Sequence, residues 1–270
     1  ALVAFAREST GDDSLEITNW DVGFWAERMR EKEYNLSDEE LRPYFPFPKV
    51  LEGLFAISKR LFDIDVVAAD GDVQVWNKDV RYFKINNAQG EQIADFYLDP
   101  YSRPADKRGG AWMDSLFGRG PREDGSIRLP TAILACNQTP PAGDRPSLMS
   151  HREVETLFHE FGHGLHHLLT QVDELSVSGI NGVAWDAVEL PSQFMENWTY
   201  EREALDRFAR HVDTGETIPD ALLEKLRASR RFQAGMATVR QLEFALFDLR
   251  LHRDHVAGQP ARIDDTLAAV

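Results

Sequence analysis

Five of the eight histidines in the 270-residue sequence lie between positions 151 and 167, and two of them form an H-E-x-x-H motif. His159 and His163 stand four residues apart, and Glu160 directly follows the first. Residues of an α-helix turn by about 100° each, so histidines at this spacing share a face and can bind one metal ion. Glu160 would lie beside them, where its carboxylate can accept a proton from water. The motif predicts a zinc site with a general base; the alternative is a pair of helix histidines satisfied by ordinary hydrogen bonds.

A catalytic zinc site takes three protein ligands and keeps a further position open. Metzincins supply the third ligand from a histidine six residues after the motif, with a glycine between. Here His166 and Leu169 occupy those two positions, which excludes that pattern. The remaining option is a carboxylate further along the chain. Five acidic residues qualify by spacing alone: Asp173, Glu174, Asp186, Glu189 and Glu196.

The elements that must position these residues begin with a predicted helix over residues 151–170. Apolar residues recur along it at helical spacing: Val154, Leu157, Phe158, Phe161, Leu165 and Leu168. Ser150 and Glu153 have the spacing of a capping box at its start. Gly162 costs the helix about 1 kcal/mol relative to alanine. A glycine at this position therefore indicates that another stretch of backbone passes close by.

Periodicity and turn residues predict the other elements. Residues 1–65 are expected to be helical, with Ser37 and Glu40 as a capping box and a second helix after Pro48. Strands are expected over residues 73–75, 82–85, 93–98 and 128–137, with the first three in an antiparallel meander. Residues 100–125 are expected to form loops, and further helices are predicted over 184–206 and 219–256.

The composition narrows the choice of partners. Acidic residues outnumber basic ones by 45 to 30, giving a net charge of −15, which argues against nucleic acid as a partner. No apolar run approaches the roughly 20 residues that cross a bilayer, so no membrane association is expected. The single cysteine, Cys136, excludes an internal disulfide or a thiolate zinc cluster. Because the sequence lacks an initiator methionine, we expect a piece of a longer polypeptide.

Two longer strings around the motif are far more specific than the motif itself. The segments 158–166 (FHEFGHGLH) and 178–198 (SGINGVAWDAVELPSQFMENW) closely resemble the thimet-oligopeptidase-like (M3) family of zinc metallopeptidases. The segment 95–103 (DFYLDPYSR) is similar to that family as well, so the resemblance covers nearly all of the chain.

The resemblance implies a zinc-dependent endopeptidase that hydrolyses short peptides in the cytoplasm, with one zinc ion per chain. It implies His159 and His163 as zinc ligands, Glu189 as the third ligand and Glu160 as the general base. Short peptides are then the expected partners of a monomeric protein. The implied fold is zincin-like α+β, mainly helical with a small antiparallel β-sheet. We expect residues 1–270 to be part of one catalytic region, helical over 1–65, a β-rich meander with loops over 66–138, and a helical zinc-binding part over 150–257.

The sequence also departs from the family. Family members are more than twice as long and carry, after the part seen here, a glycine-containing loop rich in histidine and tyrosine that faces the oxyanion. The last tyrosine of this chain is Tyr200, and nothing over 201–270 resembles that loop. The alternative function is therefore a zinc-binding but catalytically silent protein, and we expect this chain alone to be a poor peptidase.

Further residues around the motif have two interpretations each. Asp186 stands three residues before Glu189, so on a helix it could hold the free ring nitrogen of a ligand histidine, or be a helix-terminal acid without a metal role. His166 shares the ligand face and could contact substrate or the zinc shell, or simply be packed or solvated. Pro191 predicts an irregular first turn just after Glu189.

Two features suggest how a peptide could be held. The strand 131–137 could pair with an extended substrate at a sheet edge, or be purely structural. Arg103, Lys107 and Arg108 could bind a peptide carboxylate, or form a solvated basic loop.

Overall fold

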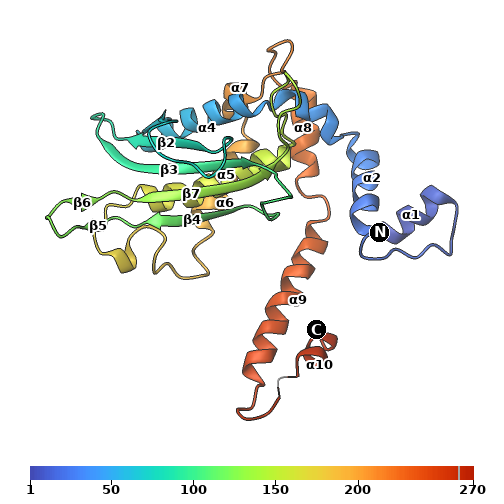
Figure 1. Cartoon of the computed structure of the whole chain (residues 1–270). Helices are drawn as coiled ribbons and strands as arrows, with labels where there is room; N and C mark the ends of the chain where they lie inside the picture. The colour runs from blue at the N-terminus through green and yellow to red at the C-terminus, as the bar shows by residue number, and fades with distance from the viewer. Residues whose placement is uncertain (261) are drawn as a thin grey trace. The chain divides into compact units, whose positions relative to one another are not determined.

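The computed structural model describes residues 1–260 and 262–270. These residues form two compact units, one of residues 36–223 and one of residues 1–35 together with 224–270. The H-E-x-x-H motif lies in the first unit, which combines a sheet with helices (Figure 1). The prediction of a mainly helical α+β fold is confirmed, while the single region expected over 1–270 stays a prediction.

The main sheet of the first unit has five strands. In spatial order they are β1 (Asp65–Ala68), β2 (Arg81–Asn86), β3 (Gln92–Tyr101), β7 (Thr131–Gln138) and β4 (Trp112–Phe117). A separate pair is formed by β5 (Gly120–Pro121) and β6 (Ile127–Arg128). In the main sheet β3 and β7 run parallel, and the other neighbours are antiparallel.

The sheet differs from the expected antiparallel meander in three ways. It is mixed, because the chain passes to the far edge as β4 and then returns as β7 between β3 and β4. Residues 73–75 form no strand, and the chain pairs with β2 through residues 65–68 instead. Residues 100–125, expected to be loop, contain β4. This strand is mostly exposed, and its sequence WMDSLF lacks a clean alternation of apolar and polar residues.

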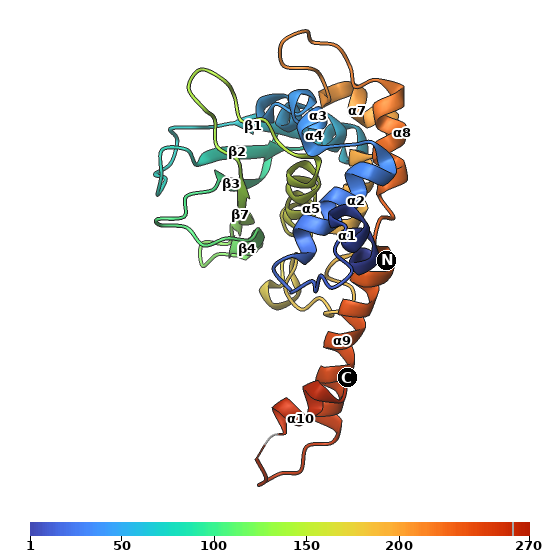
Figure 2. The same cartoon turned by 90° about the vertical axis from the view of Figure 1, so that its right-hand side faces the viewer.

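Helices cover one face of this sheet (Figure 2). They include α4 (Phe47–Phe62) and α5 (His151–Leu168). Phe83 and Phe96 of the sheet stack on each other, with ring centroids 5.1 Å apart. The ring of Phe55 from α4 packs edge-on against Phe83, with a centroid distance of 5.2 Å. The ring of Phe161 from α5 packs edge-on against Phe96, with a centroid distance of 5.6 Å. Such aromatic pairs add about 0.5–1.5 kcal/mol each to the burial of their area. This cluster fixes α5, and with it the motif, against the sheet.

The two helices with predicted capping boxes start as expected, whereas two predicted long helices are not continuous. Both capping boxes form: Ser37 with Glu40 opens α3 (Asp38–Leu41), and Ser150 with Glu153 opens α5. The helix expected over 184–206 consists of α6 (Leu190–Glu196), a 3₁₀ turn (Asn197–Thr199) and α7 (Arg202–Phe208). The helix expected over 219–256 consists of α8 (Asp220–Ser229) and α9 (Ala234–Arg253). Gln233 interrupts the latter with a left-handed backbone (φ 53°).

The regular elements that the structure describes in the second unit are all helices, joined by turns and irregular segments. It contains α1 (Leu2–Thr10), α2 (Val22–Tyr34), α9 and α10 (Ile263–Ala268). Tyr34 at the end of α2 contacts Phe232 edge-on, with ring centroids 5.9 Å apart. In the described ranges no helix is both long and apolar enough to cross a membrane.

Candidate metal centre

The two motif histidines lie one turn apart on α5. Their ring centroids are 4.9 Å apart and the ring planes are nearly perpendicular, at 87°. His163 is the more buried of the two side chains, with 11% of its area exposed against 26% for His159. Burial lowers the pKa of His163, so this imidazole is neutral at pH 7, the form in which histidine binds a metal.

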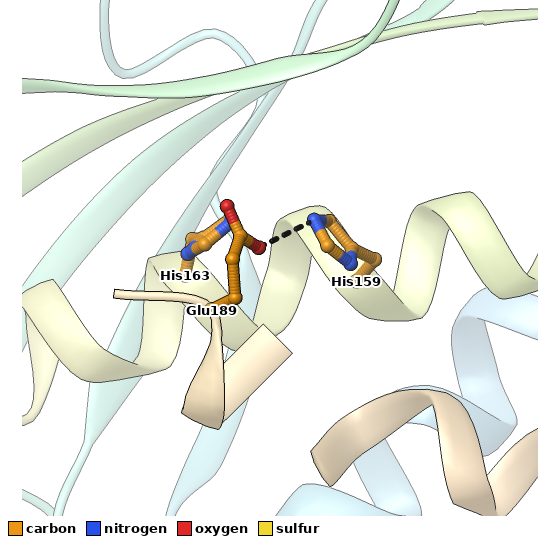
Figure 3. A group of neighbouring side chains, drawn as sticks. All are labelled: His159, His163 and Glu189. Carbon is orange, nitrogen blue, oxygen red and sulfur yellow. Dashed lines mark ion pairs between the residues drawn. The ribbon is translucent and has the colours of Figure 1, made fainter. Parts of the chain in front are cut away.

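A close contact between two helices brings the third member of the group into place. A Cβ atom built on Gly162 of α5 would lie 2.6 Å from the carbonyl oxygen of Pro191 and from the Cα of Ser192. The backbone predicted to pass near Gly162 is therefore the first turn of α6. Pro191 fits there because the first helical turn needs no N–H donor. Glu189, the residue before α6, is thereby held over the histidines (Figure 3).

The donor atoms of the three side chains converge. Oε2 of Glu189 lies 3.3 Å from Nε2 of His159 and 3.2 Å from Nε2 of His163. In a tetrahedral zinc site with bonds of about 2.0–2.1 Å, neighbouring donor atoms stand about 3.3 Å apart. Two imidazoles and one carboxylate are also a donor set that zinc takes in catalytic sites. The separations and the chemistry of the donors thus fit zinc.

Two neighbouring side chains orient the donors. Nδ1 of His159 lies 2.7 Å from Oε1 of Glu196, a carboxylate oxygen that can accept a hydrogen bond from Nδ1 and so leave Nε2 available to bind a metal. The buried hydroxyl of Ser192 donates to Oε2 of Glu189 at 2.8 Å and also lies 2.9 Å from its carbonyl oxygen. The sequence interpretation missed both roles. The available signal was spacing, since Glu196 follows Glu189 by seven residues, or two helical turns.

Glu160 lies beside this group and is 6% exposed. Burial raises the pKa of Glu160 to about 7; nearby His159 lowers it and Glu189 raises it. A carboxyl group with a pKa near the working pH can both accept and return a proton. The position and the pKa suit a general base.

Glu160, His159, His163 and Glu189 line one cavity of about 690 Å³. One wall comes from the start of β4, with Ala111, Trp112 and Met113. The other wall comes from the segment before α6, with Ile180, Asn181, Gly182, Val183, Trp185 and Val188. Apart from His159, Glu160, His163 and Glu189, the described residues that line the cavity carry no charged side chain, so the rest of its lining is mainly apolar.

The other acidic candidates lie elsewhere. Asp173 forms an ion pair with Arg119 at 2.7 Å, and Glu174 is exposed next to a short 3₁₀ turn. Within the described ranges, the group of possible metal ligands that forms is His159, His163 and Glu189.

Asp186 does not hold a ligand histidine in this structure. Residues 185–189 form turns instead of the expected helix, because α6 begins only at Leu190. Asp186 is therefore exposed, and Glu196 makes the hydrogen bond that was expected of it.

His166 faces a different space from the ligand pair. It lines an apolar cavity of about 630 Å³ together with Gly162, Leu165 and Leu190, outside the cavity of Glu160. Its Nδ1 is buried and has no hydrogen-bond partner among the described residues, and burial lowers its pKa. The structure thus separates His166 from the cluster.

Two of the three basic residues considered for a peptide carboxylate are already engaged. Asp99, 3% exposed, pairs with Arg103 at 2.7 Å and with Lys107 at 3.0 Å, and accepts a hydrogen bond from Trp76. Lys107 also donates to the carbonyl oxygens of Asp99, Tyr101 and Cys136. Arg103 and Lys107 therefore tie down the loop before β4, and Arg108 remains exposed.

The edge strand is also not the expected one. The strand 131–137 is part of β7, which has β3 on one side and β4 on the other, so both of its edges are paired. The free edge next to the cavity belongs to β4. Peptide pairing along residues 131–137 is thus excluded while the sheet is intact.

Comparison with known proteins places the chain in a family. Residues 1–270 match Peptidase family M3. The chain is 54% identical over 267 residues to organellar oligopeptidase A, chloroplastic/mitochondrial, of Arabidopsis thaliana, covering 98% of this chain and 34% of the relative. It is 49% identical over 269 residues to oligopeptidase A of Escherichia coli (strain K12), covering 100% of this chain and 39% of the relative. A dipeptidyl carboxypeptidase of Salmonella typhimurium is 38% identical over 265 residues, with 93% and 38% covered.

The chain accordingly spans about a third to two fifths of the length of these relatives. The family match nevertheless runs over every position of the sequence. We conclude that the chain belongs to peptidase family M3.

Proposed function

We propose that this chain carries the zinc-binding part of an endopeptidase that hydrolyses short peptides. His159, His163 and Glu189 would hold one zinc ion per chain, and Glu160 would act as the general base. The observation that carries this proposal is the convergence of three donor atoms, with Oε2 of Glu189 at 3.2–3.3 Å from both Nε2 atoms. The family and the names of its relatives support peptides as the substrate class.

A zinc ion at this group supplies a Lewis acid that polarises the scissile carbonyl and lowers the pKa of water. The chain's own residues do the remaining work. Glu160 takes a proton at its carboxylate from the attacking water and returns it to the nitrogen of the leaving amine. Glu196 keeps the proton of His159 on Nδ1, and Ser192 orients the carboxylate of Glu189.

The edge of β4 is the surface that we propose for the peptide backbone. An extended peptide can add to an exposed sheet edge through main-chain hydrogen bonds. β4 has one such edge, and its first residues, Trp112 and Met113, line the cavity of Glu160. A peptide bound there would pass the proposed metal ligands and Glu160, so that they could reach its carbonyl groups.

We also propose that the protein is a monomer and acts in the cytoplasm. One relative is named for chloroplasts and mitochondria, so relatives of this chain are not confined to one compartment.

The lining of the cavity favours a second candidate, a zinc-binding protein without appreciable turnover. Among the described residues that line it there is no tyrosine, arginine or lysine to stabilise an oxyanion. Tyr200 is 8% exposed, and its hydroxyl donates to Glu155 at 3.1 Å. Loss of one oxyanion donor typically costs about 10²–10³-fold in kcat.

An assay with an internally quenched peptide separates the two candidates. We expect the zinc-loaded chain to cleave the peptide slowly, at least about 10²-fold below a full-length oligopeptidase A. The activity should vanish with a chelator and return with zinc. Stoichiometric zinc without any turnover would favour the second candidate. A chain that binds no zinc would contradict both.

A further inference from the structure

His167 lies on α5 four residues beyond His163, and none of its surface is exposed. Nothing above assigns it a role. Its two ring nitrogens contact two different segments of the chain. Nε2 lies 3.0 Å from the carbonyl oxygen of Phe117, the last residue of β4. Nδ1 accepts a hydrogen bond from the backbone N–H of Ile180 at 3.5 Å.

These two contacts determine which ring nitrogen of His167 carries the hydrogen. A carbonyl oxygen only accepts, so Nε2 must carry the hydrogen that it donates to Phe117. A backbone N–H only donates, so Nδ1 must present its lone pair to Ile180. Burial is the main cause that lowers the pKa of His167, which keeps the ring neutral and both bonds intact at pH 7. One neutral imidazole thus joins the end of β4 to the segment before α6.

The segment before α6 fits closely around this ring. Gly179 has a left-handed backbone (φ 63°), and a Cβ atom there would lie 2.5 Å from Nδ1 of His167 and 2.9 Å from its carbonyl oxygen. Ser178 next to it is fully buried and donates to the carbonyl oxygen of Val172 at 2.8 Å. The turn at 178–180 therefore has little freedom to move away from His167 without breaking these contacts.

The two segments that His167 joins are the two walls of the cavity around Glu160. Strand β4 supplies Trp112 and Met113 to one wall, and the segment that begins at Ile180 supplies the other. His159 and His163 are fixed by α5 itself, and Glu189, although it follows the second wall in sequence, is fixed by the packing of α6 against Gly162 and by the hydroxyl of Ser192. The spacing of the walls and the placement of the metal ligands are thus set by different contacts.

We propose that His167 is a positioning residue that fixes the two walls of the cavity relative to each other, and so determines how tightly a peptide is held without affecting the metal. The inference rests on the proposed function in taking this cavity as the peptide site. It does not require that the chain turn over substrate.

The test uses the zinc-loaded chain with His167→Leu, which fills the space without hydrogen bonds, and His167→Gln, which can still donate and accept. Val50→Ala, a cavity-forming change at a fully buried position of α4, is the control for general loss of stability. Two ligands are compared: acetohydroxamate, which reports on the metal, and a tripeptide hydroxamate, which also needs the walls. Hydrogen exchange of residues 112–117 and 179–183 is measured on the same proteins.

We expect His167→Leu to bind zinc and acetohydroxamate within about threefold of the unmodified chain, and the tripeptide hydroxamate at least tenfold more weakly. Exchange should rise in both segments. His167→Gln should show little of either effect, and Val50→Ala should show neither. The proposal is overturned if both segments stay protected in His167→Leu. It is also overturned if exchange rises equally in α4 and β2, or if the tripeptide gains nothing over acetohydroxamate in the unmodified chain. Failure of the unmodified chain to bind zinc would instead contradict the proposed function. The exchange measurements would still test whether His167 holds the end of β4 and the segment at Ile180 together.

Discussion

Two carboxylates hold the imidazole of His159 between them. Glu196 lies 2.7 Å from Nδ1 and Glu189 lies 3.3 Å from Nε2. A carboxylate that accepts the proton of Nδ1 fixes the tautomer and makes Nε2 a better ligand, whereas the carboxylate at Nε2 occupies a ligand position. At the residue scale, the two acids therefore have different roles in the proposed site, and their substitution should have different effects.

We expect Glu196→Gln to weaken zinc binding about 10–100-fold, the usual cost of losing such a partner. The fold should be retained, since Glu196 is at the end of a short helix. Asp186→Asn is the matched control, because Asp186 is exposed in the same segment and should leave zinc affinity unchanged. Competition with a chromophoric chelator measures both. Equal affinities for Glu196→Gln and the unmodified chain would remove Glu196 from the site.

We also expect Glu160→Gln to keep its zinc and lose turnover. Glu160 is not among the converging donors, so the metal does not depend on it. Its proposed part is the proton transfer, which typically contributes about 10²–10⁴-fold to the rate. Zinc content and kcat are measured on the same preparation, with Glu174→Gln as an exposed control. A kcat within about threefold of the unmodified protein would contradict the assignment.

At the scale of elements, the sequence was most informative where local rules decide. Ser150 with Glu153 and Ser37 with Glu40 form the predicted capping boxes, because such caps involve only neighbouring residues. Gly162 also marked the close approach of another backbone. Local rules could not identify that backbone as α6. They also extended a helix through Asp186, where the structure has a turn, and so favoured Asp186 over Glu196 as a possible partner of a motif histidine.

Tertiary pairing decided the rest. The parallel pairing of β3 with β7 depends on the path of the chain through β4, a strand whose weak sequence pattern indicated a loop. The contacts of His167 were equally inaccessible, because they join residues 50 and 13 positions away in the sequence. A sequence pattern cannot show which backbone groups will meet an imidazole.

The approach at Gly162 gives a prediction with a control on the same helix. Gly162→Ala would place its methyl group 2.6 Å from the backbone of α6, so the helices must separate and move Glu189. We expect a loss of about 1–3 kcal/mol in the free energy of unfolding, as in overpacked cores, together with weaker zinc binding. At Gly164 the nearest atom is a side-chain carbon of Leu134 at 3.4 Å. Gly164→Ala should be neutral or stabilise the helix by up to about 1 kcal/mol. Urea unfolding and zinc titration measure both; equal behaviour of the two variants would contradict the role of Gly162.

The ion cluster before β4 gives a prediction about pH. Burial alone would raise the pKa of Asp99, but hydrogen bonds from Arg103, Trp76 and Lys107 outweigh it and hold the pKa at about 2. Asp99→Asn removes the carboxylate that two partly buried cations, Arg103 and Lys107, share, and should cost up to about 3–5 kcal/mol at pH 7.

Because the folded pKa of Asp99 lies below its ordinary value of 3.8, its stabilisation is complete above that value and is lost as the pH falls towards 2. The gap in urea midpoint between the unmodified chain and Asp99→Asn should therefore shrink between pH 4 and pH 2. Asp72→Asn, which breaks the exposed pair with Lys84, should cost at most about 1 kcal/mol at pH 7. A gap that does not change with pH would show that the Asp99 charge contributes little.

At the scale of the whole molecule, metal binding and turnover have different requirements. All three proposed ligands and the proposed base lie in the unit of residues 36–223. The chain spans about a third to two fifths of its relatives' length, and its described cavity lining has no tyrosine, arginine or lysine. We therefore base the central claim on the position of the metal, which this unit can provide by itself.

The most direct measurement is anomalous diffraction at the zinc edge from crystals of the zinc-loaded chain. We predict one peak per chain, at about 2.0–2.2 Å from Nε2 of His159, Nε2 of His163 and a carboxylate oxygen of Glu189. Data collected below the edge provide the control, because the peak must then disappear. A peak at any other side chains, or no peak in crystals soaked with zinc, would contradict the account.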